Sequence, residues 1–66
     1  MKTGRKIRKI RRENEITQLE LCSLAGGKYT QTMLSKIELG ERKLTIDEIK
    51  DFAKALNISI YELIEE

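Results

Sequence analysis

The sequence lacks several residue types on which enzymes and metal proteins commonly depend. It contains no histidine, which removes the commonest general base and metal ligand. Cys22 is its only cysteine, so neither an internal disulfide nor a zinc cluster can be built. A glycine-rich phosphate loop is also absent. We therefore expect a protein that is not an enzyme and that holds neither a cofactor nor a metal.

Long apolar runs are missing as well. No run approaches the roughly 18 residues of a membrane span. The basic N-terminus is not followed by the apolar core of a secretory signal. These two absences predict a cytoplasmic protein with no membrane partner.

What is present suits one small helical domain, residues 1–66. Of the 66 residues, 39% are apolar and 36% are charged, and the frequent Lys, Glu, Arg, Ile and Leu favour helices. A domain of this size buries only about 60% of the surface that its unfolded chain exposes. Its stability should be modest, so oligomerisation or ligand binding would help it.

The charges are unevenly distributed along the chain. Residues 1–33 carry 8 Lys/Arg and 3 Asp/Glu, a net of +5, whereas residues 34–66 carry 5 and 8, a net of −3. A basic half on a small domain suggests a phosphate-rich partner. The alternative interpretation is a merely solvated helix face, which charge alone would favour.

The apolar spacing and helix-start signals predict five helices. The first spans about residues 4–14, with Ile7 and Ile10 facing inward. The second starts at residue 18, buries Leu21, Cys22 and Ala25, and ends at a left-handed glycine, residue 26. The third follows a threonine N-cap at residue 30 and runs to about residue 39, with glycine at residue 40 as its stop.

Three pairs with the S/T-x-x-E spacing of a capping box mark helix starts. They are Thr17 with Glu20, Thr45 with Glu48, and Ser59 with Glu62. The second pair opens a fourth helix through residues 46–56, and the third opens a short fifth helix. Since no stretch alternates with a period of two, the fold class is predicted to be all-α and compact.

The second and third predicted helices form a candidate helix-turn-helix, and the surrounding sequence resembles a known family. Its segments are IRKIR at residues 7–11, TQLELC at 17–22, glycine at 26, LSKIELG at 34–40 and LTIDEIKDFAKALNISIYEL at 44–63. In this order they resemble the Cro and lambda-repressor-like (XRE-type) helix-turn-helix family over nearly the whole chain. The turn between residues 26 and 30 is two residues longer than is usual there, and Leu24 stands at a normally polar position.

The resemblance implies a sequence-specific regulator of transcription that binds double-stranded DNA. The third helix would lie in the major groove and read base edges with Gln31, Thr32, Ser35 and Lys36. Contacts to the DNA backbone would come from Gln18, Lys28, Arg42 and Lys43. For each side chain taken alone, an ordinary exposed position is the competing interpretation.

Three further contacts are expected. The resemblance implies a largely buried ion pair between Arg11 and Glu38. Tyr29 is expected to pack against Leu24, which would account for the longer turn. The surplus of apolar residues near the C-terminus predicts a homodimer interface, which would suit a near-palindromic operator, at these residues: Ile58, Ile60, Tyr61 and Ile64.

Two other interpretations stay open. One is a protein-interaction module, in which the acidic fourth and fifth helices bind a partner protein. The other is the excised N-terminal DNA-binding domain of a longer peptide-sensing regulator. A restriction-modification controller, a small phage-type repressor and an antitoxin all fit the short form.

Overall fold

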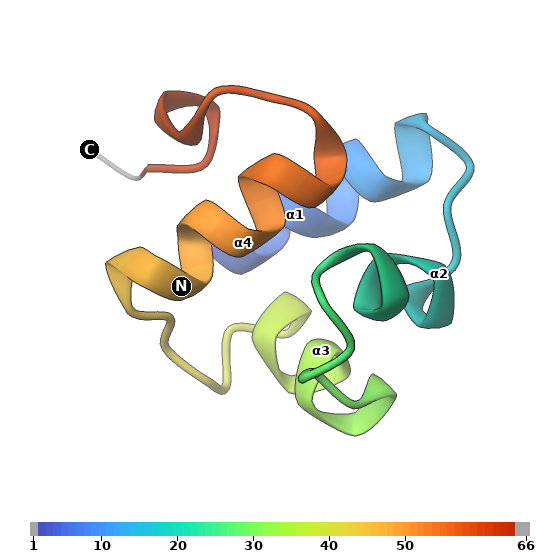
Figure 1. Ribbon diagram of the computed structural model, residues 1–66. Helices are drawn as coiled ribbons and strands as arrows, with labels where there is room; N and C mark the ends of the chain where they lie inside the picture. The colour runs from blue at the N-terminus through green and yellow to red at the C-terminus, as the bar shows by residue number, and fades with distance from the viewer. Residues whose placement is uncertain (1, 65–66) are drawn as a thin grey trace.

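A computed structural model describes residues 2–64 of the chain (Figure 1). It contains four α-helices and one 3-10 turn: α1 (Lys2–Glu13), α2 (Gln18–Leu24), α3 (Gln31–Glu38), α4 (Ile46–Leu56) and η1 (Ile60–Glu62). Residues 2–64 include no strand, so the all-α fold class is confirmed for this part of the chain. None of the described helices has the length and apolar content that a membrane span needs.

The predicted fifth helix is wrong, because this segment forms only the single 3-10 turn η1. The backbone N–H groups of Glu62 and Leu63 donate to the carbonyls three residues earlier, at Ser59 and Ile60. An α-helix gains stability only after a costly first turn has been fixed, and 3-10 geometry suits short pieces. The capping box at Ser59 is nevertheless present.

The local start signals correspond closely to the observed helices. All three predicted capping boxes are formed, at Thr17, Thr45 and Ser59. In the first of them, hydrogen bonds from Thr17 hold the pKa of the Glu20 carboxyl below its usual range. The first helix is the exception, since it begins two residues before the predicted start.

The four helices enclose the core, because α1 and α2 each pack on both α3 and α4 (Figure 1). Phe52 of α4 is fully buried there. Fully buried aliphatic side chains surround it: Ile7, Leu21, Leu34, Ile37 and Leu63. The predicted inner faces of the first three helices are buried, with Ile10 only partly so. On α4 the expectation is wrong at Ile46, which was expected to face inward but is 57% exposed because it is the first residue of the helix. Burial also raises the pKa of the Cys22 thiol, so this side chain behaves as a small packing residue.

The N-terminal turn of α1 passes very close to the C-terminal turn of α3. A methyl group placed on Gly4 would collide with the backbone carbonyl of Ile37. Only glycine permits this approach without a shift of one helix. The contact fixes the distance between α1 and the recognition candidate α3.

The longer turn between α2 and α3 is anchored on α4. Tyr29 is buried and its ring centroid lies 4.6 Å from that of Phe52, while its hydroxyl donates to Asp51 at 2.8 Å. Leu24 stays 57% exposed, and Tyr29 contacts Phe52 and Asp51 of α4, so the packing of Tyr29 against Leu24 stays a prediction. Helix α4 offers Tyr29 the ring of Phe52 for packing and the carboxylate of Asp51 as a hydrogen-bond acceptor, and Leu24 has neither group.

Candidate nucleic-acid interface

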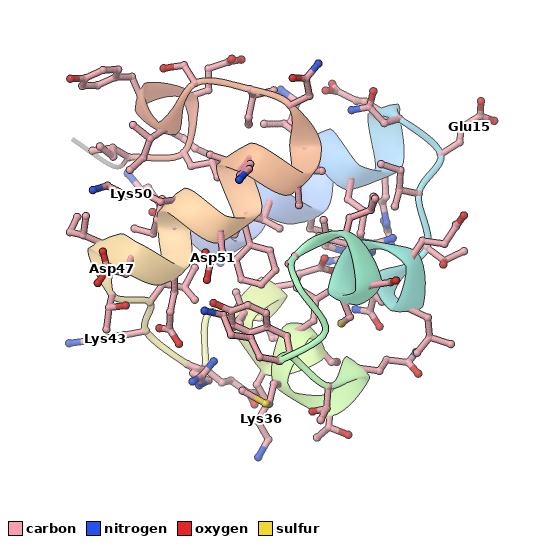
Figure 2. The ribbon with its side chains drawn as sticks, viewed as in Figure 1. Glu15, Lys36, Lys43, Asp47, Lys50 and Asp51 are labelled. Carbon is pink, nitrogen blue, oxygen red and sulfur yellow. The ribbon has the colours of Figure 1, made fainter. Side chains whose placement is uncertain are left out.

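The outer side of the α2–α3 pair carries a shallow polar hollow of about 340 Å³. It is lined by all four predicted base-reading residues of α3 and by the predicted backbone contact of α2: Gln31, Thr32, Ser35, Lys36 and Gln18. These side chains belong to two helices, and Gln18 and Gln31 are 13 positions apart in the sequence. The fold nevertheless brings them to one surface. The Lys36 side chain extends away from the body of the molecule (Figure 2).

The sequence of α3 explains why these residues face outward. Leu34 and Ile37, three residues apart, are fully buried and hold the helix on the core. Thr30 caps the helix by accepting a hydrogen bond from the backbone N–H of Met33. The first turn after this cap therefore presents Gln31 and Thr32 to solvent.

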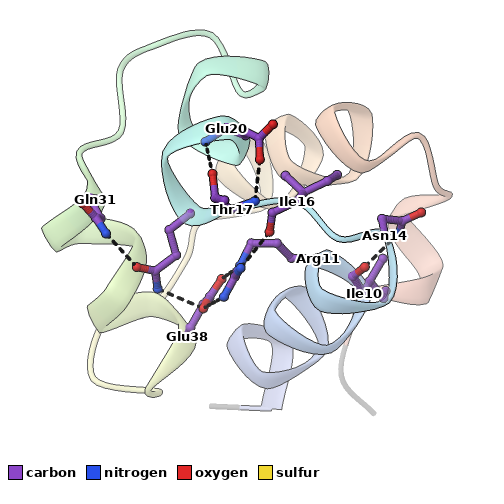
Figure 3. A network of polar contacts seen from close by, with 9 residues as sticks. Ile10, Arg11, Asn14, Ile16, Thr17, Glu20, Gln31 and Glu38 are labelled. Carbon is purple, nitrogen blue, oxygen red and sulfur yellow. Dashed lines mark hydrogen bonds and ion pairs between the residues drawn. The ribbon is translucent and has the colours of Figure 1, made fainter.

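The predicted ion pair between Arg11 and Glu38 is present and buried (Figure 3). Two guanidinium nitrogens of Arg11, Nε and Nη2, donate to the two carboxylate oxygens at 2.7 and 3.0 Å. Nη1 of Arg11 donates to the backbone carbonyl of Ile16 at 2.8 Å. The hydrogen bond to Glu38 raises the pKa of Arg11. Arg11 therefore connects the end of α1 to the end of α3 through Glu38, and to the loop before α2 through Ile16.

The ion pair continues outward into the candidate interface. Gln18 Nε2 donates to Glu38 at 3.1 Å, and Gln18 Oε1 accepts from Gln31 Nε2 at 3.4 Å (Figure 3). A carboxylate can only accept hydrogen bonds, so it fixes which end of the Gln18 amide points inward. Gln31 consequently keeps its own carbonyl oxygen and one N–H free at the surface.

The other predicted backbone contacts lie in different settings. Lys28 is mostly exposed, but its ammonium pairs with Asp51 at 2.9 Å. Arg42 pairs with Glu48 at 3.2 Å, and its Nη1 is buried without a hydrogen-bond partner. Lys43 is exposed in the loop between α3 and α4 (Figure 2). None of these three lines the hollow described above.

The residues of the predicted dimer interface divide into two groups. Tyr61 is 82% exposed, whereas Ile58 and Ile60 are partly buried against the core of the same chain. Ile64 is half-buried. The apolar surplus near the C-terminus is therefore partly used inside the domain, and Tyr61 is its most exposed member.

Several contacts of this region were not foreseen from the sequence. The link from Glu38 to Gln18 and the anchoring of the turn through Asp51 both join residues at least 20 positions apart. Such long-range polar contacts leave no periodic signal in a single sequence. Arg8 and Arg12 also border the candidate interface, and the basic composition of the first helix was the only hint of this.

Comparison with known proteins agrees with the geometry. A family described as helix-turn-helix matches residues 7–63. A solved structure of a PrgX mutant has a TM-score of 0.83 and is 24% identical, covering 96% of this chain but only 20% of that chain. The chain thus spans about a fifth of the length of that protein, and the likeness concerns the fold. Comparison with curated proteins gives no match. The chain belongs to the Cro/lambda-repressor-like (XRE-type) helix-turn-helix family.

Proposed function

We propose that this protein is a sequence-specific DNA-binding regulator of transcription whose residues 1–66 act as one DNA-binding domain. The observation that carries the proposal is the gathering of Gln18, Gln31, Thr32, Ser35 and Lys36 around one hollow in a helix-turn-helix chain. The major groove of B-DNA is about 12 Å wide and admits an α-helix whose outer face is exposed, as that of α3 is. In the proposed complex α3 enters that groove.

The free groups on α3 match the donor and acceptor pattern of base edges. A glutamine amide pairs with adenine N6 and N7, and Gln31 keeps both a donor and an acceptor free for this. Thr32 can meet a thymine methyl group, and Lys36 can reach the acceptors of guanine. Ser35 lies half-buried between them and suits a short contact.

Backbone contacts complete the proposed complex. Gln18, Lys28, Arg42 and Lys43 would bind phosphates and fix the register of α3. Lys43 is free for this in the described structure, whereas Lys28 and Arg42 must exchange carboxylate partners for phosphate. The unmet donor of Arg42 favours such an exchange, because a phosphate oxygen would satisfy it.

We further propose a homodimer that binds a near-palindromic operator. One domain reads few bases, and two copies whose α3 helices lie about 34–36 Å apart would read two successive major grooves. Tyr61 supplies an exposed aromatic side chain for the interface, flanked by Ile58, Ile60 and Ile64. Sedimentation of wild type and Tyr61→Glu should give a dimer and a monomer respectively, and monomer for both with and without DNA would refute the dimer.

Selection of duplexes from a random pool tests the proposed function. The protein should enrich a defined motif made of two inverted halves. Affinity for the enriched duplex should exceed that for random duplex by a factor of at least about 10³, and both should fall as salt rises. Failure to retain any duplex at low salt would refute DNA binding. Retention without an enriched motif would refute sequence-specific regulation.

A further inference from the structure

Two arginines of α1, Arg8 and Arg12, lie beside α3. Two other α1 residues fix how the helices meet, because Gly4 and Arg11 both contact the C-terminal turn of α3. Successive residues of an α-helix are turned by about 100°, so positions 4 and 11 share one face of α1. Positions 8 and 12 lie roughly 40–80° around the helix from position 4. The side chains of Arg8 and Arg12 therefore lie at the edge of the contact between α1 and α3.

A hollow of about 400 Å³ connects this edge to the proposed reading face. Arg8 and Arg12 line it together with Gln18, Gln31 and Ser35. The last three are proposed DNA contacts, so the two arginines border the same surface as the reading residues. The arginines do not lie on a separate face of the molecule.

A second hollow, of about 600 Å³, extends the basic surface along α1. Its lining shares Arg8 and Arg12 with the first hollow and adds Arg5 and Lys9. Glu13 is the acidic residue of α1 in that lining. The positive charge therefore continues outward from the reading face in one direction.

The charges of Arg8 and Arg12 are not compensated within the described chain. The neighbouring guanidinium of Arg11 is neutralised by Glu38. Arg8 and Arg12 are exposed, and within residues 2–64 neither side chain forms a hydrogen bond or an ion pair. Two unpaired guanidinium groups next to the reading face favour an anionic partner there.

We propose that Arg8 and Arg12 bind the sugar–phosphate backbone of the same duplex that α3 reads, beyond the edge of the major groove. This inference rests on the proposed function. A helix lying in the major groove has a phosphate strand on either side, and guanidinium groups bind phosphate oxygens in bidentate fashion. Continuity with Gln18 and Gln31 makes the DNA backbone a better occupant than an acidic protein segment.

The salt dependence of binding tests this assignment. The double variant R8Q/R12Q should bind both the enriched duplex and a random duplex of about 30 base pairs, three helical turns, more weakly than wild type. The slope of log K against log salt should become shallower by about 1.8, since each lost phosphate contact removes about 0.9. R8K/R12K should keep the wild-type slope, because lysine still supplies a positive charge to each phosphate.

A charge-matched variant separates phosphate contact from net charge. K50Q/K54Q removes the same charge from exposed positions on α4 that line neither hollow. Its slope should stay within about 0.5 of wild type. If the double variant unfolds, the single variants R8Q and R12Q give the same test. Each should make the slope of log K against log salt shallower by about 0.9.

Three outcomes would overturn the inference. If R8Q/R12Q and K50Q/K54Q show equal slopes while wild type binds DNA, the arginines make no phosphate contact, and the proposed function stands. If wild type binds polyglutamate, and R8Q/R12Q loses this binding but keeps the wild-type salt slope on DNA, Arg8 and Arg12 hold an acidic protein segment. If wild type binds no duplex at low salt, the proposed function fails together with this inference.

Discussion

At the scale of single residues, Glu38 joins the interior of the fold to the proposed reading face. Its carboxylate accepts two hydrogen bonds from Arg11 and a third from Gln18, whose amide in turn accepts one from Gln31. The carboxylate is nearly inaccessible, with 3% of the side chain exposed. One buried charge therefore fixes both the position of α1 and the orientation of two amides.

Glu38→Ala should lower the free energy of unfolding by about 3–5 kcal/mol, because it leaves Arg11 buried without its counter-charge. Urea denaturation at neutral pH measures the change. Arg42→Ala is the control, since its pair with Glu48 is partly exposed and should contribute at most about 1 kcal/mol. Equal stability losses for the two variants would contradict the account of the buried pair.

A second residue-scale prediction concerns Asp51 and pH. Hydrogen bonds from Lys28 and then from Tyr29 hold the pKa of Asp51 below its usual value of about 3.9. A carboxyl whose pKa is lower in the folded state stabilises the fold above its unfolded pKa, and this contribution is lost as pH falls through the folded pKa. Asp51→Asn should therefore be less stable than wild type above about pH 5, and the difference should shrink below about pH 4. Denaturation midpoints across this range would show it, and a difference independent of pH would refute it.

At the scale of the elements, the close crossing of α1 over α3 depends on Gly4. Alanine in place of glycine inside a helix ordinarily stabilises by about 0.5–1 kcal/mol. Gly4→Ala should instead destabilise by about 1–3 kcal/mol, because the methyl group would meet the Ile37 carbonyl and push the helices apart.

Thermal unfolding of Gly4→Ala beside Ser23→Ala makes the comparison. Ser23 is exposed in α2, where alanine should be neutral or slightly stabilising. A melting temperature for Gly4→Ala at or above that of wild type would show that the α1–α3 contact can accommodate a methyl group at this position.

The elements also show how far a sequence of this kind can be interpreted. The helix starts at Thr17, Thr45 and Ser59 were predictable because a capping box is a local signal within four residues. Packing of Tyr29 on Phe52 was not predictable, because it depends on how a turn folds back onto a helix residue 23 positions later. The prediction of a fifth α-helix was wrong for a related reason, since apolar spacing over one turn does not distinguish α-helical from 3-10 geometry.

At the scale of the whole molecule, the proposed reading face combines predictable residues with unpredictable neighbours. The exposure of Gln31, Thr32 and Lys36 could be predicted because the buried spacing of Leu34 and Ile37 leaves them outside. Which arginines of α1 lie near Gln31 could not be predicted, since only the crossing of α1 over α3 places Arg8 and Arg12 there. The electropositive surface therefore extends beyond the helix-turn-helix itself.

The most direct test of the central claim is the affinity of Gln31→Ala and Thr32→Ala for the enriched duplex and for random duplex at one salt concentration. Each substitution should cost about 1–3 kcal/mol on the enriched duplex and little on random DNA, because base contacts carry sequence preference. Lys43→Ala, the comparison variant, should weaken both duplexes alike and make the salt slope shallower by about 0.9. If Gln31→Ala and Thr32→Ala also weaken both duplexes equally, α3 does not read the bases, and the proposed function is wrong in its central element.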